Sequence, residues 1–198
     1  MFANEFLLAK SKNYRKLPKI LLERFIRMIT GFQLKATKAV LDLTAKEIAN
    51  AIGIHQGTLV RLGLTSNLEF LKCNAKNIIL LRKFFESRGI LFPNENTLSL
   101  KTTITPIPIT NQLTRFQLKA ARVVSELTQE ELSYYIKVSS STISILEKFK
   151  NLEYIKSTKI NIVLLKKYFE HLGIMFPNDF SISLTNKESS TFITKKLK

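Results

Sequence analysis

The stretch that decides the fold reads Thr128-Gln-Glu-Glu-Leu-Ser-Tyr-Tyr-Ile-Lys-Val-Ser-Ser-Ser-Thr-Ile-Ser-Ile-Leu-Glu147. Its opening Thr-Gln-Glu-Glu is a capping-box signature, in which the threonine hydroxyl accepts a backbone N–H and the later glutamate bonds back. The serines at 139–141 favour a second helix start, because serine competes for backbone groups inside helices and satisfies them at helix ends. We therefore expect two short helices, the first from about Gln129 to about Ile136, joined by a tight turn at 137–138.

The same pattern occurs twice along the chain. Thr30-Gly-Phe-Gln-Leu-Lys-Ala returns 84 residues later as Thr114-Arg-Phe-Gln-Leu-Lys-Ala, and about thirty of the 71 paired positions are identical without a gap. A match of that length indicates two copies of one domain, residues 30–100 (repeat 1) and 114–184 (repeat 2). A linker at 101–113 separates them, and its two prolines and β-branched residues predict an extended, fairly stiff chain. A basic N-terminal arm or helix (1–29) and a basic tail (185–198) lie outside the repeats.

Each repeat is expected to hold two further helices and a β-hairpin. The first helix covers about 116–126 in repeat 2, and a longer fourth helix covers about 158–172, with its equivalent at about 74–88. Glycine follows the fourth helix in both repeats, as a left-handed C-terminal cap requires. The inner face of the helix at 158–172 is expected to carry Ile160, Val163, Leu164 and Tyr168. Because an isolated two-stranded hairpin is marginal in water, we expect the two hairpins to pair with each other.

Composition and charge narrow the class of function. The chain has 198 residues and a net charge of +16, which favours a polyanionic partner, nucleic acid first and an anionic membrane surface second. About half of the surplus lies outside the repeats, and an AT-rich genome would also raise the lysine content. No apolar run reaches the roughly 18 residues of a membrane span, and the first residues do not resemble a signal peptide, so a cytoplasmic location is expected.

The reactive side chains do not form a catalytic or metal-binding pattern. Cys73 is the single cysteine, which excludes a disulfide framework and a cysteine-based zinc site. His55 and His171 lie 116 residues apart without ligand-like company. No acid–base pair, nucleophile constellation or phosphate-cradling glycine loop occurs either. We therefore expect a protein that is not an enzyme and that needs no cofactor or metal.

Two short helices joined by a tight turn form a helix-turn-helix pattern, whose second helix suits entry into the DNA major groove. The strings Gln117-Leu-Lys-Ala-Ala-Arg-Val-Val-Ser-Glu-Leu-Thr-Gln-Glu-Glu-Leu and Val138-Ser-Ser-Ser-Thr-Ile-Ser-Ile-Leu-Glu resemble the XRE (Cro/phage-repressor-like) helix-turn-helix family. The similarity is greatest to the subtype that ends in a Gly-Ile-x-Phe strand and hairpin, and it covers each repeat nearly whole. It implies a mainly α fold, with two tandem lambda-repressor-like helix-turn-helix domains that each end in a short β-hairpin.

The resemblance also implies a function and a location. It predicts a bacterial, cytoplasmic and nucleoid-associated transcription factor that binds double-stranded DNA sequence-specifically, with repression favoured over activation. The two domains would form a pseudo-dimer within one chain.

The family pattern implies roles for individual residues in repeat 2. Gln129 resembles a phosphate-contacting glutamine, and Ser139 resembles a cap that touches phosphate. Arg122 and Glu147 match a structural ion pair that ties the first helix to the end of the third. Ile145 departs from the pattern, which has Arg or Gln at this position. The apolar side chain therefore predicts weak base reading by repeat 2. The predicted DNA-binding set is Gln56, Gly57, Thr58, Arg61, Gln129, Ser139, Ser140, Ser141, Thr142 and Ser144.

Repeat 1 departs from the family pattern in the opposite way. Gln56 and Arg61 stand at base-reading positions, where glutamine suits adenine and arginine suits guanine. Ala45 replaces the glutamine equivalent to Gln129, and Gly63 replaces the glutamate, which leaves Lys38 without that partner. Repeat 1 is therefore expected to be better equipped for bases but looser, and repeat 2 firmer.

One rival function and several partners stay open from the sequence. The rival is a non-enzymatic protein-interaction module of antitoxin or anti-activator type, built on degenerate helix-turn-helix repeats and supported by Ile145, Gly57 and Gly63. A homodimer through the hairpins or the N-terminal helix and a regulatory protein partner are further options. The N-terminal helix itself could dock on repeat 1, form a dimer contact or lie on a membrane surface.

Overall fold

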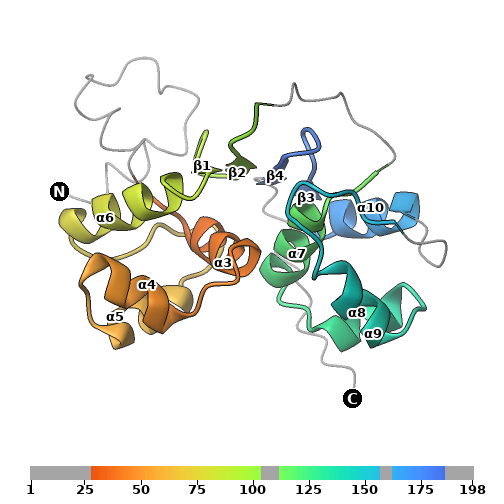
Figure 1. Ribbon diagram of the computed structural model, residues 1–198, viewed down its shortest axis with the longest axis horizontal. Coiled ribbons are helices and arrows are strands. Elements are labelled where there is room, and N and C mark those ends of the chain that lie inside the picture. The colour runs from red at the N-terminus through yellow and green to blue at the C-terminus, as the bar shows by residue number, and fades with distance from the viewer. Residues whose placement is uncertain (1–27, 104–111, 157–161, 186–198) are drawn as a thin grey trace.

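The computed structural model describes residues 28–103, 112–156 and 162–185, and this part of the chain is rich in helix (Figure 1). The N-terminal arm up to residue 27, linker residues 104–111, residues 157–161 and the tail from residue 186 lie outside the described residues. Both repeats follow the same order of four helices and two strands. Repeat 1 contains α3 (Gly31–Val40), α4 (Ala45–Ile52), α5 (Gln56–Gly63), α6 (Ala75–Glu86), β1 (Ile90–Leu91) and β2 (Thr97–Leu100). Repeat 2 contains α7 (Arg115–Val124), α8 (Gln129–Tyr135), α9 (Ser140–Leu146), α10 (Ile162–His171), β3 (Ile174–Met175) and β4 (Ser181–Leu184).

The starts of the short helices are confirmed. At α8 the Thr128 hydroxyl accepts the Glu131 N–H at 3.0 Å, and the Glu131 carboxylate accepts the Thr128 N–H at 2.7 Å. The same capping box precedes α4. The Ser139 hydroxyl caps α9 by accepting the Thr142 N–H at 3.2 Å, and the His55 Nδ1 caps α5. Local sequence therefore decides where each of these helices begins.

One expected helix boundary and one expected helix face need correction. α7 ends at Val124 rather than 126, because Glu126 has a left-handed backbone with φ of 59°. On α10 the expectation for the inner face was wrong for Val163, which is 40% exposed, and for Leu164, which is 62% exposed; Leu165 is buried instead. Tyr168 is half-buried and packs against the core, as expected. Four consecutive apolar residues at 162–165 offer two overlapping helical stripes, and packing selects the one that includes Leu165. Ile160, the other residue assigned to that face, lies outside the described residues.

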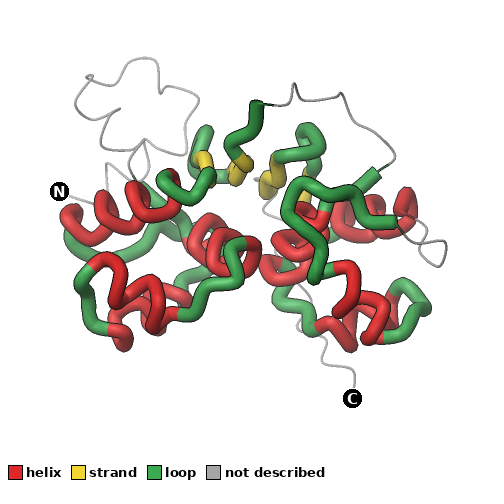
Figure 2. The backbone as a smooth tube through the Cα atoms, in the orientation of Figure 1, coloured by secondary structure: helices red, strands yellow, loops and turns green. Residues whose placement is uncertain are grey.

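The two hairpins form one antiparallel sheet in the order β1-β2-β4-β3, as expected (Figure 2). Strands β2 and β4 pair across the repeats, with Leu98 opposite Ile182. Those two positions are equivalent in the repeats, so a local twofold axis passes between them. The inner hairpin edges are thus occupied within the chain, and the two-residue strands β1 and β3 form the outer edges.

The first helices of the two repeats, α3 and α7, pack against each other below the sheet (Figure 1). Their contacts also occur in symmetric pairs. Asn67 Nδ2 donates to the Val124 carbonyl at 2.7 Å, and the equivalent Asn151 Nδ2 donates to the Val40 carbonyl at 2.9 Å. Such reciprocal contacts are typical of an isologous dimer interface, here contained in one chain.

Two further contacts of the interface are ion pairs, and they too are equivalent. Lys35 pairs with Glu126 at 3.2 Å, and Lys119 pairs with Asp42. No helix among the described residues has the length and apolar character that crossing a membrane requires.

The turn before α9 supplies a test of backbone strain. Lys137 has a left-handed φ of 55°, whereas its equivalent before α5 is Gly53 with φ of 69°. Lys137→Gly is expected to raise the free energy of unfolding by about 0.5–1 kcal/mol, because glycine adopts this conformation without a Cβ clash. Gly53→Ala is the matched control and is expected to destabilise by about 1 kcal/mol. Urea denaturation of the full-length variants measures both; a Lys137→Gly variant less stable than wild type would contradict the expectation.

Candidate nucleic-acid interface

The helix pairs α4–α5 and α8–α9 lie on the side of the molecule opposite the sheet (Figure 1). In each pair the second helix buries one face against its own repeat: Leu59 and Leu62 in α5, Ile143 and Leu146 in α9. The opposite face of each second helix remains at the surface. The chain therefore presents two equivalent helices on one side, related by the local twofold.

In repeat 1 the predicted base-reading side chains are accessible. Gln56, Gly57 and Arg61 are exposed and Thr58 is half-buried. Arg61 makes no ion pair among the described residues, so its five N–H donors are available to a partner. Its positive charge partly opposes the effect of burial, which raises the pKa of the Cys73 thiol.

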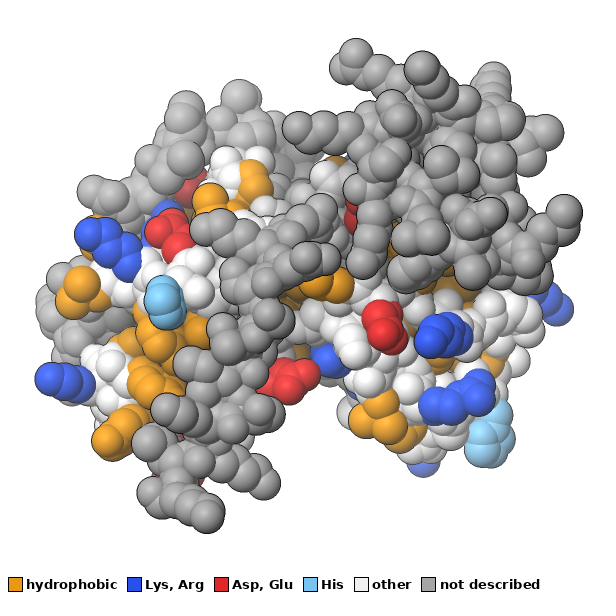
Figure 3. Space-filling view, turned by 180° about the vertical axis from the view of Figure 1, so that it is seen from behind, with side chains coloured by type: hydrophobic (Ala, Val, Ile, Leu, Met, Phe, Trp, Pro, Cys, Tyr) orange, Lys and Arg blue, Asp and Glu red, His pale blue; other side chains and the backbone are white. Residues whose placement is uncertain are grey.

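Apolar side chains lie on the same face of repeat 1. Val60 is 49% and Leu64 is 80% exposed. Figure 3, which views the molecule from behind, shows Lys and Arg side chains next to hydrophobic ones over repeat 1.

In repeat 2 the predicted residues form a hydroxyl cluster at the start of α9. Ser139, Ser140 and Ser141 are exposed, and Thr142 and Ser144 are half-buried. The Ser139 hydroxyl lies 2.8 Å from the hydroxyls of both Ser141 and Thr142. Ile145, at the position of Arg61, is 56% exposed. This surface offers hydroxyl donors and acceptors but no charged side chain on α9 itself.

Arg122 and Glu147 form the predicted ion pair, and it is largely buried. Arg122 Nε and Nη2 donate to the two Glu147 carboxylate oxygens at 2.5 and 2.8 Å, and the Glu147 side chain is only 3% exposed. Gln129, predicted to contact phosphate, donates its Nε2 to the same carboxylate at 2.9 Å. Gln129 is thus part of an internal network, and one amide hydrogen remains for another acceptor.

Repeat 1 lacks this network. Lys38 is half-buried, burial lowers the pKa of its amine, and among the described residues no carboxylate pairs with it. Gly63, in the place of Glu147, has no atom within 4 Å of the position a Cβ would occupy. Ala45 supplies no amide in place of Gln129. The expected contrast between a firm repeat 2 and a less connected repeat 1 is therefore visible in the polar contacts.

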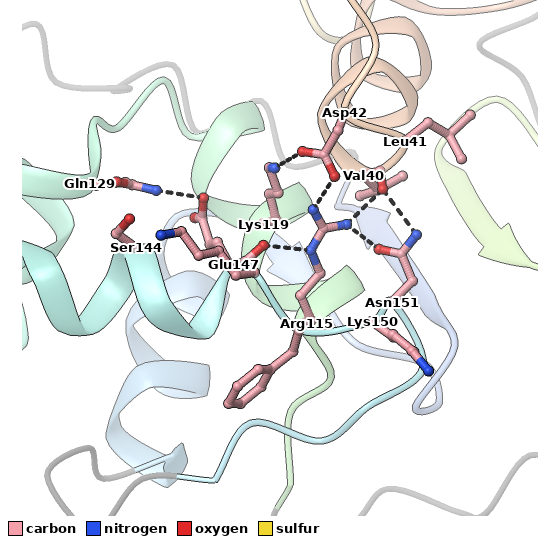
Figure 4. Close-up of a pocket in the computed structure, with 12 residues that line it drawn as sticks. Val40, Leu41, Asp42, Arg115, Lys119, Gln129, Ser144, Glu147, Lys150 and Asn151 are labelled. Carbon is pink, nitrogen blue, oxygen red and sulfur yellow. Dashed lines mark hydrogen bonds and ion pairs between the residues drawn. The ribbon is translucent and has the colours of Figure 1, made fainter.

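Arg115 is a residue of this region that the sequence interpretation missed. Its side chain is 4% exposed and donates to groups in both repeats (Figure 4). The one sequence signal that could have identified Arg115 is a difference between the repeats. The strings that begin at Thr30 and Thr114 are otherwise identical, but repeat 1 has Gly31 at this position. A Cβ at Gly31 would collide with the backbone oxygens of Thr65 and Ser66, so repeat 1 cannot hold the equivalent side chain.

A cleft of about 660 Å³ opens between the end of α3 and the end of α9, beside Arg115. Its wall includes Asp42, Lys119 and Glu147, which mix both signs of charge (Figure 4). Partial burial opposes ionisation of Asp42, but hydrogen bonds from Lys119 and Arg115 and their charges outweigh it, so the pKa of Asp42 is lowered. The described residues contain no group of three His, Cys, Asp or Glu side chains that could hold a metal ion.

Comparison of the chain with protein-family models, with curated proteins and with solved structures finds no match.

The network around Glu147 can be tested in both repeats. Glu147→Gln is expected to lower the free energy of unfolding by about 3 kcal/mol, because it leaves the Arg122 guanidinium without its buried counter-charge. Gly63→Glu is expected to raise it by up to about 1 kcal/mol relative to Gly63→Ala, through an ion pair with half-buried Lys38. Gly63→Ala is the matched control for helix propensity. Equal stability of the two Gly63 variants in thermal and urea unfolding would show that Lys38 does not reach the new carboxylate.

The lowered pKa of Asp42 predicts a pH dependence. A carboxyl whose pKa is lower in the folded state stabilises above its ordinary pKa and loses this contribution as pH falls through the folded value. The difference in unfolding free energy between wild type and Asp42→Asn should therefore be constant from about pH 5 to 8 and should shrink below about pH 4. Because Asp42 is 61% exposed, the difference should be modest and should decrease with salt. A gap that widens as pH falls would contradict the prediction.

Proposed function

We propose that the protein binds double-stranded DNA sequence-specifically and regulates transcription, with α4–α5 and α8–α9 as two helix-turn-helix units. One observation carries the proposal. The two short-helix pairs are related by a local twofold axis, lie on one side of the molecule, and present the starts of α5 and α9 to solvent. Helix-turn-helix dimers read two half-sites about one helical turn apart with this symmetry. A single chain would here hold both readers, as a tandem lambda-repressor-like pseudo-dimer.

The two readers have unequal chemistry, which supports recognition of an asymmetric DNA site. Gln56 and Arg61 on repeat 1 are exposed and suit hydrogen bonding to base edges in the major groove. The serine cluster of repeat 2 suits phosphate and groove contacts, and the Arg122–Glu147 pair holds α9 in place beneath it. We infer that repeat 1 supplies most base selectivity and that repeat 2 supplies a firmer anchor.

The net charge supports DNA as the partner but gives no information on which base sequence is bound. The +16 net charge attracts the phosphate backbone in a salt-dependent and sequence-independent way. Since about half of the surplus lies outside the repeats, the arm, linker and tail add affinity without adding selectivity. A cytoplasmic, nucleoid-associated location is part of this proposal.

A protein-interaction module is the second candidate, and exposed apolar side chains favour it. Val60 and Leu64 lie on the reading face of repeat 1, and Tyr134 on α8 is 74% exposed. Apolar side chains against polar base edges lose hydration without gaining a hydrogen bond, except beside a thymine methyl group. Such residues are more typical of a protein interface.

Selection of duplexes from a random pool by the full chain, followed by gel shifts against random competitor, tests the proposal. Arg61→Ala should lose about 1–3 kcal/mol of discrimination at one base pair, because it removes a bidentate base contact. Gln129→Ala should weaken binding to selected and random duplexes by the same factor, as loss of a phosphate contact does. Lys101→Ala, an exposed cation beside the sheet, is the control and should leave base preference unchanged. Equal affinity of wild type for selected and random duplexes would refute sequence-specific binding and favour the protein-interaction module.

A further inference from the structure

The guanidinium of Arg115 joins the two repeats from a buried position. Arg115 Nε donates to the Glu147 carbonyl at 2.9 Å, Nη2 donates to Asp42 Oδ2 at 2.5 Å, and Nη1 donates to the Val40 carbonyl at 2.6 Å. Nη1 also donates to Asn151 Oδ1. Figure 4 shows the planar group at the centre of these four acceptors. Each of its three nitrogens donates a hydrogen bond, so the rigid planar guanidinium fixes the positions of these acceptors relative to one another.

The acceptors belong to the parts of the chain that carry the two helix pairs. Val40 ends α3 and Asp42 lies in the turn before α4, both in repeat 1. Glu147 is the C-cap of α9, and Asn151 lies in the loop that follows. Arg115 therefore links the end of α9 in repeat 2 to the turn between α3 and α4 in repeat 1.

Glu147 extends this connection toward the DNA-facing surface of repeat 2. Its backbone carbonyl accepts from Arg115, while its carboxylate accepts from Arg122 and from Gln129. A continuous series of polar contacts thus runs from Asp42 in repeat 1 to Gln129 at the first residue of α8. The twofold-related positions of repeat 1 form no equivalent series of contacts, because Gly31 and Gly63 replace Arg115 and Glu147.

Besides the packing of α3 on α7 and the Asn67 and Asn151 hydrogen bonds, a further link between the repeats lies at the far side of the molecule. The β2–β4 pairing is opposite the helix pairs, so a small rotation about the sheet would change the distance between α5 and α9 (Figure 1). Two other ion pairs cross the interface, Lys35 with Glu126 and Lys119 with Asp42. Their carboxylates are 73% and 61% exposed, so these pairs constrain the rotation weakly. The buried Arg115 contacts lie where they oppose it.

We propose that Arg115 is a positioning residue that sets the separation and angle of the two helix pairs, so that the protein accepts one spacing of DNA half-sites. The inference rests on the proposed function. One inserted base pair moves a half-site by about 3.4 Å along the DNA and rotates it by about 35°. Two helix pairs held at a fixed separation and angle cannot contact both half-sites after this shift and rotation. Helix pairs that are free to rotate about the sheet can partly adjust to them.

The test compares wild type with Arg115→Lys, which keeps the charge but cannot bond four acceptors. The probe is the duplex recovered by selection with wild type, together with versions that have one or two base pairs inserted at its centre. Wild type should lose at least about tenfold in affinity on one insertion. Arg115→Lys should lose less than about threefold while it binds the original duplex nearly as well. Lys35→Ala removes the exposed ion pair across the same interface, and it should keep the wild-type dependence on spacing.

A measurement without DNA separates this inference from the proposed function. Spin labels on Gln56→Cys and Ser141→Cys report the distance between α5 and α9, with Cys73→Ser copying the serine that repeat 2 has at that position. Arg115→Lys should broaden this distance distribution, and Lys35→Ala should leave it narrow. A narrow distribution in folded Arg115→Lys, or unchanged dependence on spacing, would overturn the positioning role. Failure of wild type to select any duplex would instead overturn the proposed function.

Discussion

The pairing of two short hairpins into one sheet is the constraint on which the rest of the structure depends. A hairpin with strands of two and four residues is marginal alone, so each repeat needs the hairpin of the other. Leu98 and Ile182 are fully buried where β2 meets β4. Buried Gln33 and Gln117 bond the start of α3 and α7 to the hairpin of the same repeat. The sheet therefore sets the arrangement of the first helices, and through them that of the helix pairs.

The repeats share this framework and differ in how they use polar side chains. Contacts near the twofold axis occur in equivalent pairs, as with Asn67 and Asn151. Farther out, repeat 2 carries Arg115 and Glu147 in internal bonds, whereas repeat 1 has glycine at both positions. Repeat 2 therefore has more internal polar contacts at these positions, whereas repeat 1 has an accessible arginine, Arg61, on its surface. The chain thus carries two related but unequal surfaces.

Most of the fold was predictable because its signals are local. Capping boxes, the glycines after the fourth helices and the turn at Lys137 involve residues within a few positions of each other. The Arg122–Glu147 pair was also predicted, through the family pattern rather than through distance along the chain. The inner face of α10 was not, because four consecutive apolar residues at 162–165 satisfy two helical stripes equally well. The hydrogen bond from Gln129 to Glu147 was also not predicted, because the sequence suggested only a phosphate contact for Gln129.

By itself, the sequence determined the repeat, the order of elements and the excess of positive charge. The repeat and the charge are properties of the sequence itself, and the order of elements depends on side chains and backbone groups within one or two helical turns of each other. Tertiary structure alone decided that Arg115 bonds Val40 and Asp42, residues 75 and 73 positions away. It also decided which apolar side chains of α5 and α10 stay exposed. Packing of the two repeats brings such distant groups together, and no local pattern encodes the acceptors that a buried guanidinium will meet.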